Sequence, residues 1–148
     1  MFNSILVVCV GNICRSPTGE RLLKRALPNK LIDSAGIKAV KNSPADGDAF
    51  SVAFKNGLSL ENHIARQLSL TMCRQYELIL VMEKRHIEAV CLIAPEVRGK
   101  TMLFGHWLNQ REISDPYRQS IESYEYTYEL LDEASKKWVE VLTKETRS

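Results

Sequence analysis

Two kinds of hydrophobic pattern recur along the chain. Residues 5–8 and 76–82 are dominated by consecutive apolar residues, which is typical of strands buried on both faces of a parallel sheet. Shorter segments at residues 31–35 and 101–104 predict two further strands. Near the C-terminus, mostly apolar side chains recur at spacings of three and four, which predicts an amphipathic helix. Its stripe consists of Ile121, Tyr124, Tyr128, Leu131, Ser135, Trp138 and Leu142.

Capping and turn residues divide the rest of the chain into predicted helices and loops. Ser16 is a suitable N-cap and Pro17 a suitable first residue for a helix that ends at Pro28. The other predicted helices and loops are a helix at residues 48–56 closed by Gly57, a helix at residues 84–93 stopped near Pro95, and loops at residues 38–47 and 114–117.

Strands and helices therefore alternate, with no linker or internal repeat between them. This order predicts one domain over residues 1–148 with an α/β fold, a three-layer sandwich around a four-stranded parallel sheet of the flavodoxin-like or Rossmann-like kind. In such sheets, ligands bind at the carboxyl ends of the strands, where the strand order reverses. The loop at residues 9–16 leaves the first strand at that edge and is the first candidate for a binding site.

Composition narrows the class of protein. The chain is 45% hydrophobic and carries a formal net charge of only +2, which favours a globular protein and gives no support for a nucleic-acid partner. The longest apolar stretch is far shorter than the roughly 20 residues that cross a bilayer, so we expect no stable membrane insertion. Four cysteines without a CxxC pair or zinc spacing indicate free thiols and no metal. A cytoplasmic monomer is expected.

The predicted loop combines a cysteine with an arginine six residues later, Cys9 and Arg15. Backbone N–H groups in a tight turn before a helix can surround an anion, and the arginine fork can hold two phosphoryl oxygens. The same positive surroundings favour a nucleophilic thiolate at Cys9. The alternative is that Cys9 is a buried small hydrophobe and Arg15 a surface cation. The nucleotide-binding pattern GxxxxGK[ST] is missing, which disfavours NTP hydrolysis.

A phosphoryl transfer from tyrosine also needs an acid, because phenol has a pKa of about 10 and is a poor leaving group when unprotonated. Asp115 is the best candidate, in a loop that Pro116 stiffens beside Tyr117. After transfer, its carboxylate can act as the base on water. Read alone, Asp-Pro is also a common turn dipeptide.

The stretch VCVGNICRSP and the later DPY resemble the low-molecular-weight protein tyrosine phosphatases. Ser34-Ala35-Gly36, His63 with Ala65-Arg66-Gln67, and Met82-Glu83 also match, and MEKRHIE and APEVRGKTMLFGHW are similar to the bacterial branch. That branch is paired with membrane-bound tyrosine autokinases of capsule and exopolysaccharide assembly. The resemblance implies a phosphocysteine intermediate, no metal and no cofactor.

Carried onto this sequence, the resemblance makes Cys9 the nucleophile, Arg15 the transition-state clamp and Asp115 the general acid and base. It implies that Asn12 shapes the loop through Ser34 and His63. The residues expected to contact substrate are Val10, Gly11, Asn12, Ile13, Cys14, Ser16 and Tyr117, with Ser16 also donating a hydrogen bond to the Cys9 thiolate. Tyr117 and aliphatic residues between Ile37 and Val40 would wall a deep cleft for a phosphotyrosine ring.

Three other functions are weighed against this interpretation. Arsenate reductase shares the loop but needs two further cysteines after the third strand, where this chain has Met82 and only Cys91 nearby. A phosphoarginine phosphatase resembles this chain but carries threonine in place of Ile13. A phosphotyrosine-binding module would not need nucleophile, arginine and acid together. Cys14 either captures an oxidised Cys9 in a disulfide or packs beneath the loop.

Overall fold

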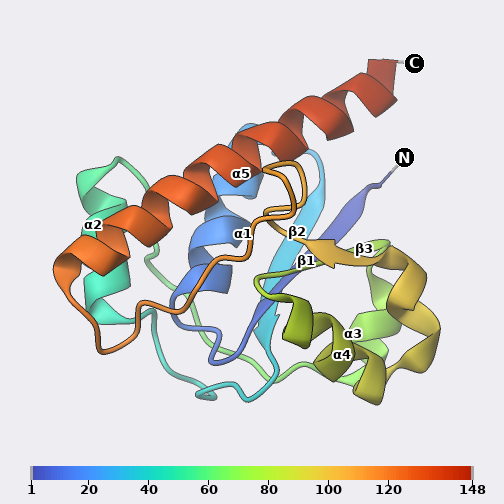
Figure 1. Ribbon diagram of the computed structural model, residues 1–148, viewed down its shortest axis with the longest axis horizontal. Helices are drawn as coiled ribbons and strands as arrows, with labels where there is room; N and C mark the ends of the chain where they lie inside the picture. The colour runs from blue at the N-terminus through green and yellow to red at the C-terminus, as the bar shows by residue number, and fades with distance from the viewer. Residues whose placement is uncertain (1, 148) are drawn as a thin grey trace.

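Four parallel strands form the central sheet of the computed structural model, which describes residues 2–147. Their order is β2-β1-β3-β4, so the chain leaves β1 toward one neighbour and later returns to the other side. The switch point therefore lies at the carboxyl end of β1, as predicted (Figure 1). The strands are β1 (Ser4–Cys9), β2 (Leu31–Gly36), β3 (Leu78–Val81) and β4 (Thr101–Leu103).

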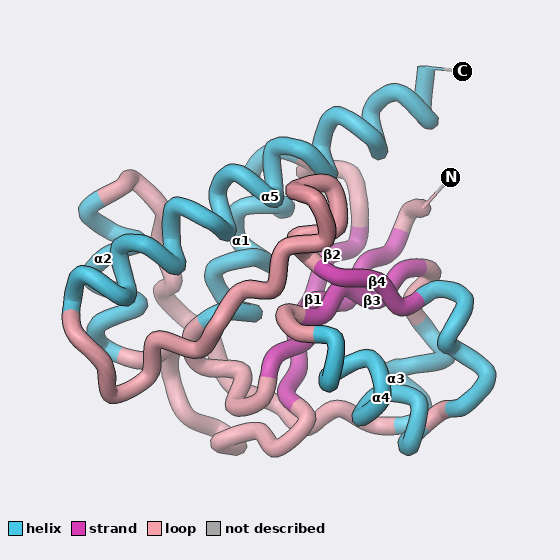
Figure 2. The backbone as a smooth tube through the Cα atoms, viewed as in Figure 1, coloured by secondary structure: helices cyan, strands magenta, loops and turns pink. Residues whose placement is uncertain are grey.

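Helices cover both faces of the sheet, which explains the uninterrupted apolar runs. Successive residues of β1 point to opposite faces, so Ile5 and Val7 pack with the layer that contains α1, α2 and α5, while Leu6 and Val8 pack with α3 and α4 (Figures 1 and 2). The predicted three-layer sandwich is confirmed. The helices are α1 (Arg15–Ala26), α2 (Gly47–Lys55), α3 (Leu70–Gln75), α4 (Lys84–Ile93) and α5 (Ile121–Arg147).

The start of α1 differs from the prediction. Cys14 occupies the N-cap position, without a side-chain cap, and the helix begins at Arg15, so the prediction that Ser16 caps the helix is wrong. The Ser16 hydroxyl is instead occupied by contacts to Cys9 and Asn12. Pro17 sits inside the first turn, where its missing N–H has no intrahelical partner to lose.

Two short helical elements, α3 and a 3₁₀ turn, were not predicted from the sequence. Ser69 caps α3 by accepting a hydrogen bond from the Met72 backbone N–H at 3.2 Å, and a 3₁₀ turn (Pro95–Lys100) precedes β4. Six residues are too few to display helical periodicity. The closure of α2 is confirmed: Gly57 has φ +80°, and it donates to the Phe54 carbonyl at 3.0 Å, a left-handed ending that glycine adopts without strain.

The C-terminal helix packs as its apolar stripe predicts except at Ile121, which lies at the first position of the helix and is 43% exposed. Tyr124, Tyr128, Leu131 and Trp138 are all buried in the α1 side of the core, and the Trp138 indole donates to the Phe104 carbonyl at 2.8 Å. Within residues 2–147, no helix is both long and apolar enough to cross a membrane.

Candidate active site

The loop between β1 and α1 has its carbonyl groups turned outward. Each carbonyl from Cys9 to Cys14 accepts a hydrogen bond from a group beyond the loop, at 2.6 to 3.3 Å. The donors are the backbone N–H groups of Ile37, Lys38, Val40, Asp46 and Thr18 and the Nε2 of His63. Because C=O and the following N–H point in opposite directions across a trans peptide, the N–H groups of residues 10–15 point inward. The loop therefore forms a nest for an anion at the N-terminus of α1.

Tight backbone packing fixes this shape. A Cβ on Gly36 would lie 2.5 Å from the Val10 carbonyl oxygen and 3.0 Å from the Asn12 Cβ, so only glycine permits β2 to approach the loop this closely. Asn12 has φ 58°, a left-handed conformation that asparagine tolerates better than most residues. Both residues therefore support the tight turn.

The side chain of Asn12 organises the interior of the loop. Its Oδ1 accepts from the Arg66 backbone N–H at 3.0 Å, which fixes the orientation of the amide. Its Nδ2 then donates to Ser16 Oγ at 2.7 Å and to Ser34 Oγ at 3.0 Å. With the His63 bond to its carbonyl at 2.6 Å, the predicted contacts of Asn12 with Ser34 and His63 are confirmed.

The directions of the Asn12 hydrogen bonds also show that the Ser16 hydroxyl donates to the Cys9 sulfur. Since Ser16 Oγ accepts from Asn12, its own proton is available for Cys9 Sγ, 3.0 Å away. Cys9 and Ser16 are almost completely buried. The Ser16 hydroxyl is thus placed as a hydrogen-bond donor against the Cys9 sulfur, which is the contact that the resemblance implies.

A second branch of the network ends on Glu20, which the sequence analysis missed. Ser34 Oγ accepts from Asn12 and donates to Glu20 Oε1 at 2.7 Å. The other oxygen of Glu20 lies 3.1 Å from Arg21 Nε and 3.3 Å from Lys24 Nζ. The chain of hydrogen bonds therefore terminates in a carboxylate that is paired with two cations.

Arg15 is 1% exposed and held from one side. Its Nη1 donates to Glu83 Oε2 at 2.6 Å and to the Ile113 carbonyl at 2.9 Å. Within residues 2–147, neither Nε nor Nη2 has a hydrogen-bond partner, and both remain available to an anion. Burial opposes the charge on Glu83, but the bond and the attraction from Arg15 outweigh it and lower the pKa of Glu83. Glu83 is the N-cap residue of α4, and no sequence pattern revealed its pairing with Arg15.

Asp115 approaches the site from an exposed loop. Its Oδ2 lies 3.7 Å from Arg15 Nη2, and its Oδ1 accepts from the Tyr117 backbone N–H at 3.0 Å. The Arg118 guanidinium lies 5.3 Å from the centre of the Tyr117 ring, so it stacks on the rim. The carboxylate is thus aimed at the cavity by a local turn.

A cavity of about 220 Å³ joins these parts. Asn12 and Ser16, which were expected to contact substrate, are fully buried behind the loop and do not line it. Val40 lines the wall as expected, whereas Ile37 packs against the opposite core. The lining residues are Cys9, Val10, Gly11, Ile13, Cys14, Arg15, Lys38, Val40, Asp115 and Tyr117.

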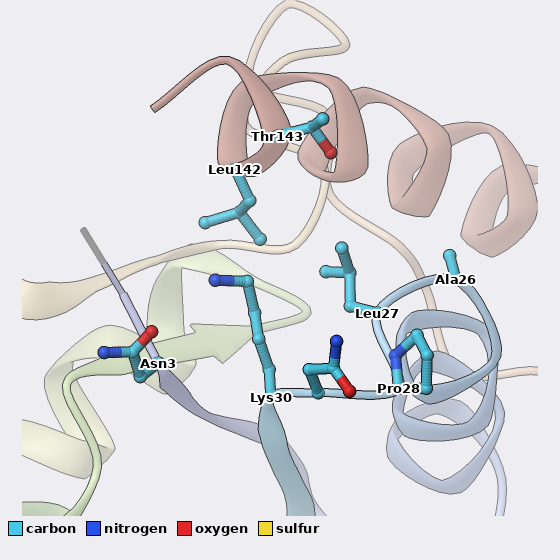
Figure 3. A pocket seen from close by; sticks show the side chains of 8 residues that line it. Asn3, Ala26, Leu27, Pro28, Lys30, Leu142 and Thr143 are labelled. Atoms are coloured by element: carbon cyan, nitrogen blue, oxygen red, sulfur yellow. The ribbon is translucent and has the colours of Figure 1, made fainter. Parts of the chain in front are cut away.

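Larger cavities lie elsewhere on the molecule. One of about 410 Å³ lies between α1 and α5, and no cysteine lines it. A cavity of about 320 Å³ opens between the start of β2 and the ends of α1 and α5, where Lys30 lies near Asn3 and Leu27 (Figure 3). Its lining contains no cysteine, arginine or carboxylate, and the Lys30 ammonium donates to the Phe2 carbonyl at 2.7 Å. The chemistry of the lining, rather than its size, distinguishes the smaller cavity.

The remaining cysteines are buried thiols. Burial, with a further contribution from Cys9, raises the pKa of Cys14 well above its usual value, and burial raises the pKa of Cys73. Cys91 is also buried and free. Among the residues that the structure describes, no group of three or more His, Cys, Asp or Glu side chains is arranged to hold a metal ion.

Comparison with known proteins agrees with this geometry. A probable low molecular weight protein-tyrosine-phosphatase, AmsI of Erwinia amylovora, is 60% identical over 144 residues, covering 97% of this chain and 100% of that protein. The crystal structure of the tyrosine phosphatase Wzb from Escherichia coli K30 in complex with sulphate matches with a TM-score of 0.94 at 57% identity, covering 96% of this chain and 99% of the other.

A second solved structure carries an aromatic ligand. Vibrio vulnificus Wzb in complex with benzylphosphonate matches with a TM-score of 0.92 at 57% identity, covering 95% of this chain and 99% of the other. The model of the family described as low molecular weight phosphotyrosine protein phosphatase matches residues 4–148. The chain therefore belongs to the low molecular weight protein-tyrosine-phosphatase family.

Proposed function

We propose that this protein hydrolyses phosphotyrosine in proteins through a phosphocysteine intermediate on Cys9. The observation that carries the proposal is the Cys9 sulfur, which faces a hydroxyl donor at 3.0 Å inside a loop whose N–H groups converge. A dianionic phosphoryl group in the loop would lie directly above the sulfur. The sulphate complex of the related Wzb supports a tetrahedral anion as the ligand.

In the first step, the Cys9 thiolate attacks phosphorus as the bond from phosphorus to the tyrosine oxygen breaks. Asp115 transfers its proton to that oxygen, so tyrosine leaves as a neutral phenol. The N–H groups of the loop and the free N–H groups of Arg15 stabilise the charge on the equatorial oxygens. The products of this step are phosphocysteine, tyrosine and an ionised Asp115.

In the second step, water attacks the phosphocysteine. The Asp115 carboxylate takes a proton from the water, the bond between sulfur and phosphorus breaks, and inorganic phosphate leaves. The Ser16 hydroxyl stabilises the departing thiolate, because its proton is directed at the sulfur by the bond from Asn12. Asp115 is protonated again and the site returns to its starting state.

The cavity wall favours an aromatic ester. Ile13 and Val40 supply aliphatic surface, and Tyr117 supplies a ring at the rim. Benzylphosphonate in the related Vibrio Wzb is consistent with an aromatic group above the loop. An aliphatic residue at position 13 and the burial of Cys73 and Cys91 give no support for phosphoarginine hydrolysis or for an arsenate reductase relay.

We also propose that the physiological substrate is a membrane-bound tyrosine autokinase of capsule or exopolysaccharide assembly, dephosphorylated in the cytoplasm by a monomeric enzyme. This part rests on the resemblance of MEKRHIE and APEVRGKTMLFGHW to the bacterial branch of the family.

One substrate panel tests the proposal. Peptides of one sequence carrying phosphotyrosine, phosphoserine, phosphothreonine or phosphoarginine are compared, with an arsenate reduction assay that contains thioredoxin. Rapid phosphate release from phosphotyrosine alone, abolished by Cys9→Ser, is the expected result. Faster release from phosphoarginine, thioredoxin-dependent arsenate reduction, or full activity of Cys9→Ser would contradict it.

A further inference from the structure

A buried histidine lies behind the Arg15–Glu83 pair and has no part in the reaction as described so far. His86 is 3% exposed and occupies the third position of α4. Its Nδ1 accepts from the Glu83 backbone N–H at 3.2 Å. Its Nε2 lies 3.6 Å from Glu83 Oε2 and, among the described residues, has no hydrogen-bond partner.

These contacts fix the protonation of the ring. Because Nδ1 accepts a hydrogen bond, the neutral imidazole carries its proton on Nε2. Burial, followed by the charge of Arg15, lowers the pKa of His86 to about 4, although Glu83 and Glu112 act in the opposite direction and Arg85 adds to the lowering. At neutral pH, an N–H group therefore faces the same carboxylate oxygen that binds Arg15.

We propose that His86 is a positioning residue that holds Glu83, and through Glu83 the guanidinium of Arg15, in the alignment that phosphoryl transfer requires. The inference rests on the proposed function. One imidazole faces Glu83 at two points, its backbone N–H and its carboxylate.

Such a restraint matters because two arginines share the Glu83 carboxylate, each through a different oxygen. Oε2 binds the buried Arg15 at 2.6 Å, and Oε1 binds Arg85 at 3.0 Å, whose side chain is 73% exposed. Rotation of the carboxylate toward Arg85 would leave Arg15 Nη1 with only the Ile113 carbonyl as its partner and change the direction of its free N–H groups. The Nε2–H of His86 opposes that rotation by favouring Oε2 in its present place.

Three variants separate positioning from helix capping. His86→Gln keeps an acceptor for the Glu83 N–H and an N–H donor that reaches the carboxylate. His86→Asn keeps the acceptor but is too short to reach the carboxylate, and His86→Leu keeps neither. We expect kcat for an aryl phosphate to fall about 10-fold in the Asn and Leu variants, with near wild-type kcat in the Gln variant.

Two further readouts make the result decisive. Orthovanadate inhibition should weaken in parallel with kcat, and in a Glu83→Gln background the His86→Asn change should have no further effect. Full activity of His86→Asn, or an unchanged loss in the Glu83→Gln background, overturns the inference, and thermal unfolding shows which variants are folded. Failure of the proposed function is seen separately, as a wild-type enzyme that is inactive on aryl phosphates.

Discussion

Two loops border the catalytic cavity, and they are built in opposite ways. The loop at residues 9–16 is largely buried. It donates a hydrogen bond to β2 and accepts hydrogen bonds from the loop after β2, from α1 and from His63. The loop at residues 114–119 is largely exposed and is held by bonds within itself, such as Gln119 to Pro116 at 2.9 Å. The side chain of Asp115 is 43% exposed, whereas that of Arg15 is 2% exposed.

This difference matches the two tasks. Donors that stabilise charge in a transition state are most effective when they are fixed in advance, since no energy is then spent on reorganising them. An acid must meet leaving groups that enter and depart through the mouth of the cavity, which favours an exposed position on a local turn. Variants in the buried loop should therefore affect binding, chemistry and stability together, while variants in the exposed loop should affect proton transfer alone.

The largest effect is expected at Arg15. In Arg15→Lys, the charge remains but a single ammonium cannot contact Glu83, the Ile113 carbonyl and two phosphoryl oxygens at once. We expect kcat/KM for an aryl phosphate to fall about 10³-fold, measured by steady-state kinetics. Arg118→Lys, on the exposed loop, is the matched control and should change kcat/KM about 3-fold or less. Equal losses in both variants would remove the distinction between the loops.

The next effect concerns stability. Asn12→Ala removes three side-chain hydrogen bonds and places alanine at φ 58°, so the free energy of unfolding should fall by about 3 kcal/mol or more. Asn42 has a similar φ of 66° but is exposed. Asn42→Ala should lower the free energy of unfolding by about 1 kcal/mol. Both variants are measured by urea titration. Equal costs would show that backbone conformation, not the network, determines the effect.

Asp115→Asn tests the exposed loop. The amide cannot donate an acidic proton, so kcat/KM for a phosphotyrosine peptide, which reports the first step, should fall about 10²-fold. An aryl phosphate with an acidic phenol needs no such proton in that step, so its kcat/KM should fall far less, although kcat falls for both substrates because they share the second step. Stability should stay near that of the wild type, because the carboxylate is exposed and its contact with Arg15 is long. Equal losses of kcat/KM for the two substrates would exclude Asp115 as the acid of the first step.

The smallest effect is a pH dependence on the buried side of the site. The pKa of His86 is about 4 in the folded protein and about 6.5 when unfolded, so the unfolded state binds the proton first as pH falls. The stability associated with neutral His86 is present above pH 6.5 and is lost between pH 6.5 and 4. Between pH 7 and 5, wild type should lose about 2 kcal/mol more than His86→Gln. Parallel losses in the two proteins would contradict this assignment.

The sequence alone predicted those features that depend on a single residue type or on a pattern of neighbouring residues. Buried strands are recognisable by their continuous apolar residues. The chemistry of Cys9, Arg15 and Asp115 predicted a shared site, and all three line one cavity. The partner Glu83 was missed because the 68 residues that separate it from Arg15 leave no pattern. The predicted cap at Ser16 failed since its hydroxyl binds Cys9 and Asn12, a tertiary preference that overrides local capping.

The most direct test of the account is rapid-quench trapping of the covalent intermediate. The enzyme is mixed with a phosphotyrosine peptide, stopped in acid within milliseconds, and analysed by intact mass and peptide mapping. We expect one phosphoryl group, on Cys9, that forms and decays at rates matching turnover and is missing in Cys9→Ser. Release of phosphate without any phosphorylated Cys9, or phosphorus on a different residue, would contradict it.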